Sequence, residues 1–275
     1  CIRDRYSISY DGNNATSTRP IATTSAITTS GTTTLSDGKL GQGTIVSSGL
    51  LFNMNAADSS SVVNNVWYDT SRNGVTATAF GSPTYNSSEG YFQLNGSNQY
   101  INMGSLVLPS GGTTAFTASV MFKSDKPNLS DQAIMSKYEN SIGGAFIIRT
   151  AGSSKLQAWR SNYGNLTNSS TMDDGDTNYG TVTYDGTTYK LYLNGVLQSS
   201  AAAGSAGAYT VDLVLGARGY SNTIQNYFQG KIYSAQGYSR ALTASEILQN
   251  YNALLPNQIV TKSCLLYTSD AADDS

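Results

Sequence analysis

Three stretches of this sequence place aromatic rings beside amide side chains, a combination that suits sugar recognition. An aromatic ring covers the apolar side of a sugar ring, and Asn or Gln hydrogen-bonds to its hydroxyls. The first stretch holds Trp159, Asn162 and Tyr163, the second holds Asn222, Asn226 and Tyr227, and the third places Tyr138 before Asn140. Because the chain contains 19 tyrosines, the alternative for any one of these residues is an ordinary tyrosine at a strand edge.

Trp159 lies in the run Lys155–Arg160, where alternate residues point to opposite faces of a strand. Leu156 and Ala158 share one face and are the expected core residues. Trp159 shares the other face with Lys155 and Gln157, so we expect it on a wetted surface beside Arg160. The alternative is that Trp159 closes the core of a second sheet.

The residues available for catalysis are few. The sequence has no histidine, which excludes Ser-His-Asp and Cys-His nucleophile pairs and histidine metal sites. Glycosidases need only two carboxylates, but outside the two ends the chain has just three glutamates, Glu89, Glu139 and Glu246. We therefore expect no enzymatic activity.

Both ends of the chain resemble translated sequencing adapter. Residues 1–5 match a transposon-end adapter, and residues 264–268 match its reverse complement in another frame, with 269–275 continuing it. The two cysteines, Cys1 and Cys264, fall in these ends and so predict no disulfide. The rest of the chain is near neutral, which favours neither nucleic acid nor an anionic membrane as partner. No apolar run reaches the length of a membrane span, so we expect no membrane insertion.

Between these ends the composition changes once. Residues 6–46 are rich in Thr and Ser, and we interpret them as a linker or the remnant of an upstream domain. An integral first strand of the following domain is the alternative. Residues 47–255 form the expected domain, and 256–263 form a short tail.

Alternating residues predict strands throughout the domain. In the run 115–123, Phe116 and Val120 fall on one face, and Thr117 and Met121 fall on the other. Asp185-Gly186 and Asn194-Gly195 are two-residue hairpin signals, since both residues of a type I′ turn need positive φ. This spacing predicts two packed antiparallel β-sheets.

One short helix is expected near the C-terminal end. Thr243 is the expected N-cap, and Glu246 completes a capping box. Ile247, Leu248 and Tyr251 then form one apolar stripe, which must dock on a larger element because so short a helix is not stable alone.

The order of several motifs resembles one known family. The matching positions are the opening strand 49–57, the loop 67–74, and the C-terminal residues Gly230, Ile232, Tyr238, Arg240, Ala241, Leu242, Glu246 and Ile247. Together they are similar to laminin-G-like jelly rolls of the concanavalin A-like lectin/glucanase superfamily, in the version found in tailed-phage structural proteins. The resemblance covers about residues 49–253.

This resemblance implies a fold and a set of functions. The fold would be an all-β, two-sheet antiparallel jelly-roll sandwich with one short C-terminal helix. The Glu-x-Asp-x-x-Glu cluster of the superfamily's enzymes is missing. The implied function is a non-catalytic module of a virion tail or fibre protein that binds a glycan or host cell-surface polysaccharide, beside other virion or surface protein domains. A secreted bacterial adhesion domain and a purely architectural domain are the alternatives, and the location is the virion or the cell surface.

The resemblance also implies a calcium site. Many relatives hold Ca²⁺ with loop carboxylates, Asn side chains and backbone carbonyls, and Asp69 and Asn73 lie in the loop that matches a polar family motif. The alternative is that these two residues only shape an Asx-type turn.

Overall fold

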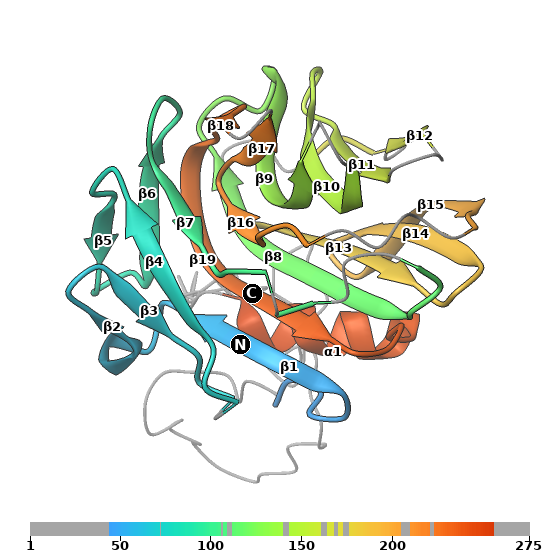
Figure 1. Ribbon diagram of the computed structural model, residues 1–275, viewed down its shortest axis with the longest axis horizontal. Helices are drawn as coiled ribbons and strands as arrows, with labels where there is room; N and C mark the ends of the chain where they lie inside the picture. Colours follow the sequence, from blue (N-terminus) through green and yellow to red (C-terminus); the bar gives the residue numbers. More distant parts are fainter. Residues whose placement is uncertain are drawn as a thin grey trace, which may run out of the picture. The chain divides into compact units, whose positions relative to one another are not determined.

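The computed structural model describes residues 44–255 apart from 72, 106, 109–111, 140–142, 161–163, 168–169, 173–175, 205–209 and 221–222. The adapter-like ends, most of the Thr/Ser-rich segment and the tail lie outside the described residues. The described chain folds into two antiparallel β-sheets, one short 3₁₀ turn (η1, Ser59–Ser61) and one α-helix (α1, Ala244–Leu254), as Figure 1 shows. The expected all-β sandwich is confirmed.

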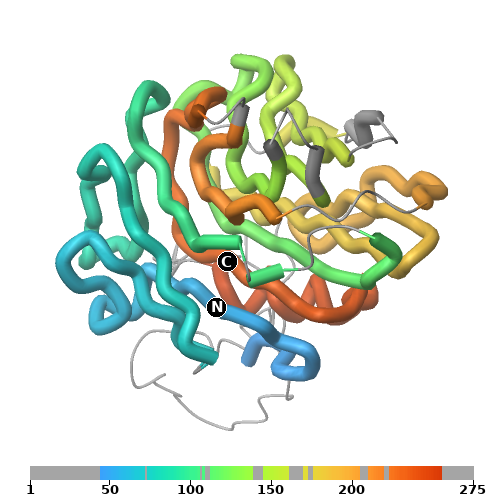
Figure 2. Tube along the Cα trace, in the orientation of Figure 1, coloured from blue at the N-terminus to red at the C-terminus, as the bar shows by residue number. Residues whose placement is uncertain are grey.

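The first sheet has eight strands, in the order β15-β14-β13-β8-β19-β6-β5, and β1 also pairs with β19. Its strands are β1 (Leu50–Asn55), β5 (Thr84–Asn86), β6 (Tyr91–Asn95), β8 (Phe116–Ser124), β13 (Asn178–Tyr184), β14 (Thr188–Leu193), β15 (Val196–Ala202) and β19 (Gln229–Tyr238). The tube in Figure 2 shows β1 and β19 side by side although they are far apart in the sequence.

The second sheet has eleven strands. Nine follow the order β12-β11-β10-β9-β16-β7-β4-β3-β2, and the hairpin β17–β18 attaches to β9. Its strands are β2 (Val62–Val63), β3 (Val66–Tyr68), β4 (Thr76–Phe80), β7 (Tyr100–Asn102), β9 (Ser130–Glu139), β10 (Gly143–Ala151), β11 (Leu156–Arg160), β12 (Gly164–Thr167), β16 (Val214–Leu215), β17 (Arg218–Tyr220) and β18 (Thr223–Gln225).

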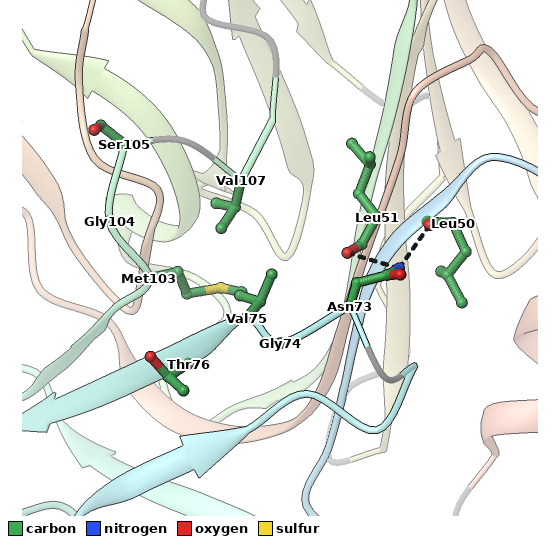
Figure 3. A pocket seen from close by; sticks show the side chains of 10 residues that line it. All are labelled: Leu50, Leu51, Asn73, Gly74, Val75, Thr76, Met103, Gly104, Ser105 and Val107. Atoms are coloured by element: carbon green, nitrogen blue, oxygen red, sulfur yellow. Dashed lines mark hydrogen bonds between the residues drawn. The ribbon is translucent and has the colours of Figure 1, made fainter.

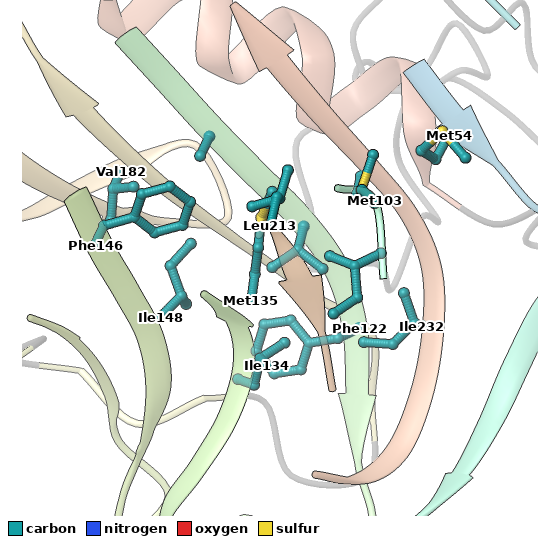
Figure 4. Close-up of a cluster of buried hydrophobic side chains, with 14 of the residues drawn as sticks. Met54, Met103, Phe122, Ile134, Met135, Phe146, Ile148, Val182, Leu213 and Ile232 are labelled. Carbon is teal, nitrogen blue, oxygen red and sulfur yellow. The ribbon is translucent and has the colours of Figure 1, made fainter. Parts of the chain in front are cut away.

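The main core lies between the two sheets (Figure 4). Its residues are those that alternation predicts for the inner faces, including Phe116 and Val120 of β8, Ile148 of β10 and Val182 of β13. Burying each such side chain contributes about 1.5–3 kcal/mol.

A second core covers the outer face of the eight-stranded sheet. There, Met121, Tyr179 and Tyr238 pack with Ile247 and Tyr251 of helix α1. The predicted cap is confirmed, because Thr243 is the N-cap and forms a reciprocal capping box with Glu246. The helix thus covers part of one broad face of the sandwich, and strand β8 is buried on both of its sides.

The two hairpin signals have different outcomes. Asn194 and Gly195 both have positive φ, +51° and +80°, and join β14 to β15 as predicted. The prediction of a two-residue turn at Asp185-Gly186 is wrong, because three residues separate β13 from β14. The Asp185 carboxylate accepts hydrogen bonds from the Thr187 and Thr188 backbone N–H groups and so holds the longer loop.

No helix in the described part of the chain has both the length and the apolar character needed to cross a bilayer.

Candidate ligand-binding face

Trp159 lies on the outer face of the eleven-stranded sheet. Leu156 and Ala158 of the same strand are in the main core, whereas the half-buried Trp159 packs outside it against Ala133, Tyr138 and Ile147. The face that alternation predicts for Trp159 is therefore confirmed. Ile147 of β10 stands directly opposite Trp159 in the strand pairing, which fixes the indole's position.

Tyr138 and Trp159 form an edge-to-face pair. Their ring centroids are 4.7 Å apart at an interplanar angle of 76°. Tyr138 is only 7% exposed, so its ring supports the more exposed indole. The Arg218 guanidinium carbon lies 5.8 Å from the Tyr138 ring centroid, within cation–π range.

The hairpin β17–β18 brings the second aromatic-amide stretch to the first. Arg218 Nε donates to Asn226 Oδ1 at 2.9 Å, and Asn226 Nδ2 donates to the Asp131 carbonyl at 2.9 Å. Asn226 has φ of +55°, a conformation that Asn tolerates better than most residues. Two of the residues predicted from separate stretches, Trp159 and Asn226, therefore belong to one surface.

A polar network continues from Asn226 along this face. Asp131 forms an ion pair with Arg149 at 2.7 Å, and Arg149 Nε donates to Gln157 Oε1 at 2.7 Å. Burial lowers the pKa of Arg149, the Asp131 carboxylate opposes that shift, and the neighbouring Arg218 adds to it. We call the surface formed by Tyr138, Arg149, Gln157, Trp159, Arg218 and Asn226 the Trp159 face.

Other predicted residues of this site have different positions. Asn162, Tyr163 and Asn222 lie outside the described residues. Arg160 was expected beside Trp159 on the wetted surface, which is wrong. It is fully buried on the inner side of β11, with its guanidinium 3.7 Å from the Tyr184 ring centroid. The reason is the strand period, because Arg160 has the same parity as Leu156 and Ala158.

Sequence reasoning missed several members of the Trp159 face. Gln157 and Arg149 carried a signal for membership of this face. Gln157 shares the parity of Trp159, and Arg149 stands opposite Gln157 in the strand pairing. Arg218 carried none, since its place depends on how the hairpin β17–β18 packs on β9.

The predicted calcium residue Asp69 is fully engaged with the protein. Its Oδ1 accepts from the backbone N–H of Asn53 at 2.7 Å and of Ser71 at 2.8 Å. Its Oδ2 accepts from Ser71 Oγ at 2.6 Å and from the Asn73 N–H at 3.1 Å. These four bonds use the carboxylate's usual acceptor capacity, so a metal ion there would have to replace some of them.

Asn73 binds the edge of strand β1. Its amide Nδ2 donates to the carbonyls of Leu50 at 3.0 Å and Leu51 at 3.2 Å, as Figure 3 shows. Asn73 and Asp69 together form hydrogen bonds to backbone groups at the edge of strand β1, which would otherwise be left unpaired. Beside it lies an open pocket of about 650 Å³, lined by Val75, Met103 and eight other residues. Among the described residues, no three carboxylate, His or Cys side chains are grouped to hold a metal ion.

Comparison with known proteins gives the family. The model for the concanavalin A-like lectin/glucanases superfamily matches residues 95–248, which is more than half of the chain. The chain belongs to this superfamily. The match runs through the Trp159 face and ends within helix α1. None of the curated proteins compared with the chain matches it significantly.

Several solved structures resemble the chain in fold at low identity. Domain 4 of AbnA, a GH43 extracellular arabinanase from Geobacillus stearothermophilus, in complex with arabinotriose, has 17% identity and a TM-score of 0.55. The match covers 74% of this chain and 98% of that one. The binding domain of botulinum neurotoxin DC in complex with SialylT has 14% identity and a TM-score of 0.58, over 76% of this chain and 52% of that one.

Trypanosoma rangeli sialidase in complex with sialic acid has 13% identity and a TM-score of 0.58. The match covers 74% of this chain but only 33% of the sialidase. The chain thus spans about half of the neurotoxin binding domain and a third of the sialidase. At such identities these likenesses describe the fold alone.

Proposed function

We propose that this domain is a non-catalytic carbohydrate-recognition module and that the Trp159 face binds the glycan. The observation that carries the proposal is the edge-to-face pair of Trp159 and Tyr138 on an outer sheet surface, at 4.7 Å. An indole held in this way offers a rigid apolar platform, which loses little conformational entropy when a ligand binds.

The polar groups around Trp159 suit sugar hydroxyls. Guanidinium groups donate hydrogen bonds, and amide side chains both donate and accept. Arg149 and Arg218 are each held through Nε by an amide oxygen, from Gln157 and Asn226 respectively. This arrangement orients the donors before a ligand arrives, which lowers the entropic cost of binding.

Structural neighbours support a glycan as the ligand. The AbnA domain was solved with arabinotriose, the sialidase with sialic acid, and the neurotoxin binding domain with SialylT. Because fold does not imply function, these ligands support the class of partner and not a particular sugar.

The biological setting that we propose is a virion. The C-terminal motif resembles that of tailed-phage structural proteins, so the module would belong to a tail or fibre protein and bind a host cell-surface polysaccharide beside other virion domains. The alternative is a secreted bacterial adhesion domain. We propose further that residues 1–5 and 264–275 are translated adapter and contribute nothing to binding.

The non-catalytic assignment rests on residue chemistry. The chain has no histidine. Of its three glutamates outside the two ends, Glu246 is bound by Arg240 and caps helix α1, and Glu89 pairs with Lys231 at 3.6 Å. These engagements are structural and do not resemble the facing pair of carboxylates that glycoside hydrolysis needs.

The test is a Trp159→Ala variant on a panel of bacterial surface polysaccharides and free oligosaccharides, measured by glycan array and calorimetry. The affinity should fall by about 1–3 kcal/mol, the loss typical of an aromatic anchor. Tyr68→Ala is the matched control, because Tyr68 is an aromatic residue of the same sheet, 43% exposed on β3. Equal affinities of parent and Trp159→Ala, or a parent that binds nothing on the panel, would refute the proposal.

A further inference from the structure

A second aromatic cluster lies on the eleven-stranded sheet. Phe80 of β4 and Tyr100 of β7 are directly paired across the strands. Their rings stack with centroids 4.9 Å apart and an interplanar angle of 7°. The ring of Tyr227 extends the cluster, 6.4 Å from that of Tyr100. Tyr227 thus belongs to this cluster, although the sequence grouped it with Asn226.

Phe80 stays 42% exposed in the described part of the chain. It points outward because Ala77 and Ala79, its neighbours on β4, fill the inner positions. An exposed aromatic ring that is already stacked on another is a flat apolar surface of fixed orientation. Such surfaces mark binding sites more often than isolated exposed residues do.

Polar groups adjoin the stacked rings. Asn102 lies two residues after Tyr100 on β7, so its side chain points to the same outer face. Its Nδ2 donates to Asp212 Oδ2 at 2.8 Å. Burial raises the pKa of Tyr100, and the nearby Tyr227 and Asp212 raise it further, which agrees with a carboxylate close to the phenol.

We infer that Phe80, Tyr100 and Tyr227 form a second sugar platform, with Asn102 and Asp212 as its hydroxyl-binding groups. Stacked rings cover the apolar side of a pyranose or furanose ring. The carboxylate and the amide then bind its hydroxyls, as acceptor and as donor or acceptor. The Asp212 charge would repel a uronate, so the platform selects neutral sugars.

This platform is separate from the Trp159 face. Strand β16 lies between β7 and β9, so the strands that carry Tyr100 and Tyr138 are about 10 Å apart. The inference extends the proposed function from one glycan site to two and rests on it only for the class of ligand. An experiment can therefore exclude either site without excluding the other.

The experiment compares Phe80→Ala, Asp212→Asn and Trp159→Ala with the parent chain. The probes are soluble neutral polysaccharides (arabinan, galactan and dextran) and uronates (polygalacturonate and alginate), measured by affinity electrophoresis. Tyr91→Ala is the matched control, because Tyr91 is an aromatic residue of β6 in the other sheet. A thermal melt of each variant checks folding, and Phe80→Leu keeps the apolar contact while removing the stacked ring.

We expect Phe80→Ala and Phe80→Leu to lose about tenfold in affinity for a neutral polysaccharide and Tyr91→Ala to lose none. The Trp159→Ala variant should keep measurable binding to that probe, and Asp212→Asn should gain affinity for the uronates. Unchanged affinities in both Phe80 variants would overturn the second platform while leaving the Trp159 face standing. Loss of all binding in the Trp159→Ala variant, with binding kept in the other variants, would also overturn the second platform.

Discussion

Arg240 and Glu246 form a bidentate ion pair at the start of helix α1. Arg240 Nη1 lies 2.9 Å from one carboxylate oxygen of Glu246, and Nη2 lies 2.6 Å from the other. The same carboxylate accepts from the Thr243 N–H at 2.8 Å, and Arg240 Nε donates to the Ser48 carbonyl at 3.0 Å. Glu246 therefore links the helix cap through Arg240 to the segment that precedes β1.

The first prediction concerns acid stability. The hydrogen bond from Arg240 lowers the pKa of Glu246 from 4.5 to about 2. The charged carboxylate therefore stabilises the fold fully above pH 4.5, and this contribution is lost as the pH falls towards 2. The size of this contribution is about 1–3 kcal/mol, because both side chains are partly exposed and solvent screens the ion pair.

Urea unfolding of the parent and Glu246→Gln across pH 2–7 measures this contribution. The variant should be less stable at pH 7, and the difference should vanish near pH 2. A difference that stays constant over this pH range would contradict the pairing.

The second prediction concerns a buried lysine. Lys137 is fully buried, and its Nζ donates to the carbonyls of Ser105 at 2.7 Å and Val211 at 2.9 Å. Burial lowers its pKa from 10.5 to about 8, and Asp212 opposes the shift. Between pH 8 and 10.5 the unfolded chain binds more protons at this residue, so its contribution to stability rises with pH.

The stability of the parent minus that of Lys137→Met should therefore increase by about 2–3 kcal/mol from pH 8 to pH 10.5. Taking this difference cancels the contribution of the tyrosines to the pH dependence, because they titrate in both proteins. A flat or falling difference in denaturation experiments would show that the ammonium is not desolvated.

The third prediction concerns the loop that carries Asp69 and Asn73. Asp69→Ala should lower the melting temperature in calcium-free buffer, because it leaves the Asn53 and Ser71 N–H groups without their acceptor. If the loop also holds Ca²⁺, millimolar calcium should raise the parent's melting temperature by preferential binding to the folded state. The variant should then lose that rise, and a parent that does not respond would leave Asp69 with the structural role alone.

The fourth prediction concerns the helix cap. Thr243→Ala should cost about 1 kcal/mol, the usual loss for an N-cap hydroxyl. Thr84→Ala, at an exposed position of the edge strand β5, serves as the control and should change stability by much less. Equal small effects in chemical denaturation would mean that the hydroxyl does not stabilise the helix.

Local pattern was enough to predict the inner faces of the sheets and the helix cap. It was not enough for the second core, because Thr117 and Ser119 of β8 look like residues of a wetted face. They are buried because their hydroxyls find partners inside. Thr117 donates to the carbonyl of Arg240, in the turn before helix α1, and Ser119 pairs with Thr181 of the neighbouring strand β13. Both partners are far away in the sequence, so local pattern does not reveal them.

The candidate site was predictable to the same extent. Strand parity placed Trp159 on the outer face, but the approach of Arg218 and Asn226 depends on where a distant hairpin packs. Parity also places Arg160 inward, against the ordinary preference of a charged side chain for solvent. The aromatic ring of Tyr184 provides an alternative to water for that guanidinium.

Helix α1 also determines how the module can be attached to other chains. Thr44 and Val46, at the entrance to the described domain, bind Gln249 and Asn250 of the helix, and the described chain leaves the domain at Leu255, directly after α1. Entry and exit therefore lie on the helix-covered face, opposite the broad face that carries Trp159 and Phe80. A tag joined directly at either residue would be attached on the helix-covered face and not on the face that carries the aromatic rings.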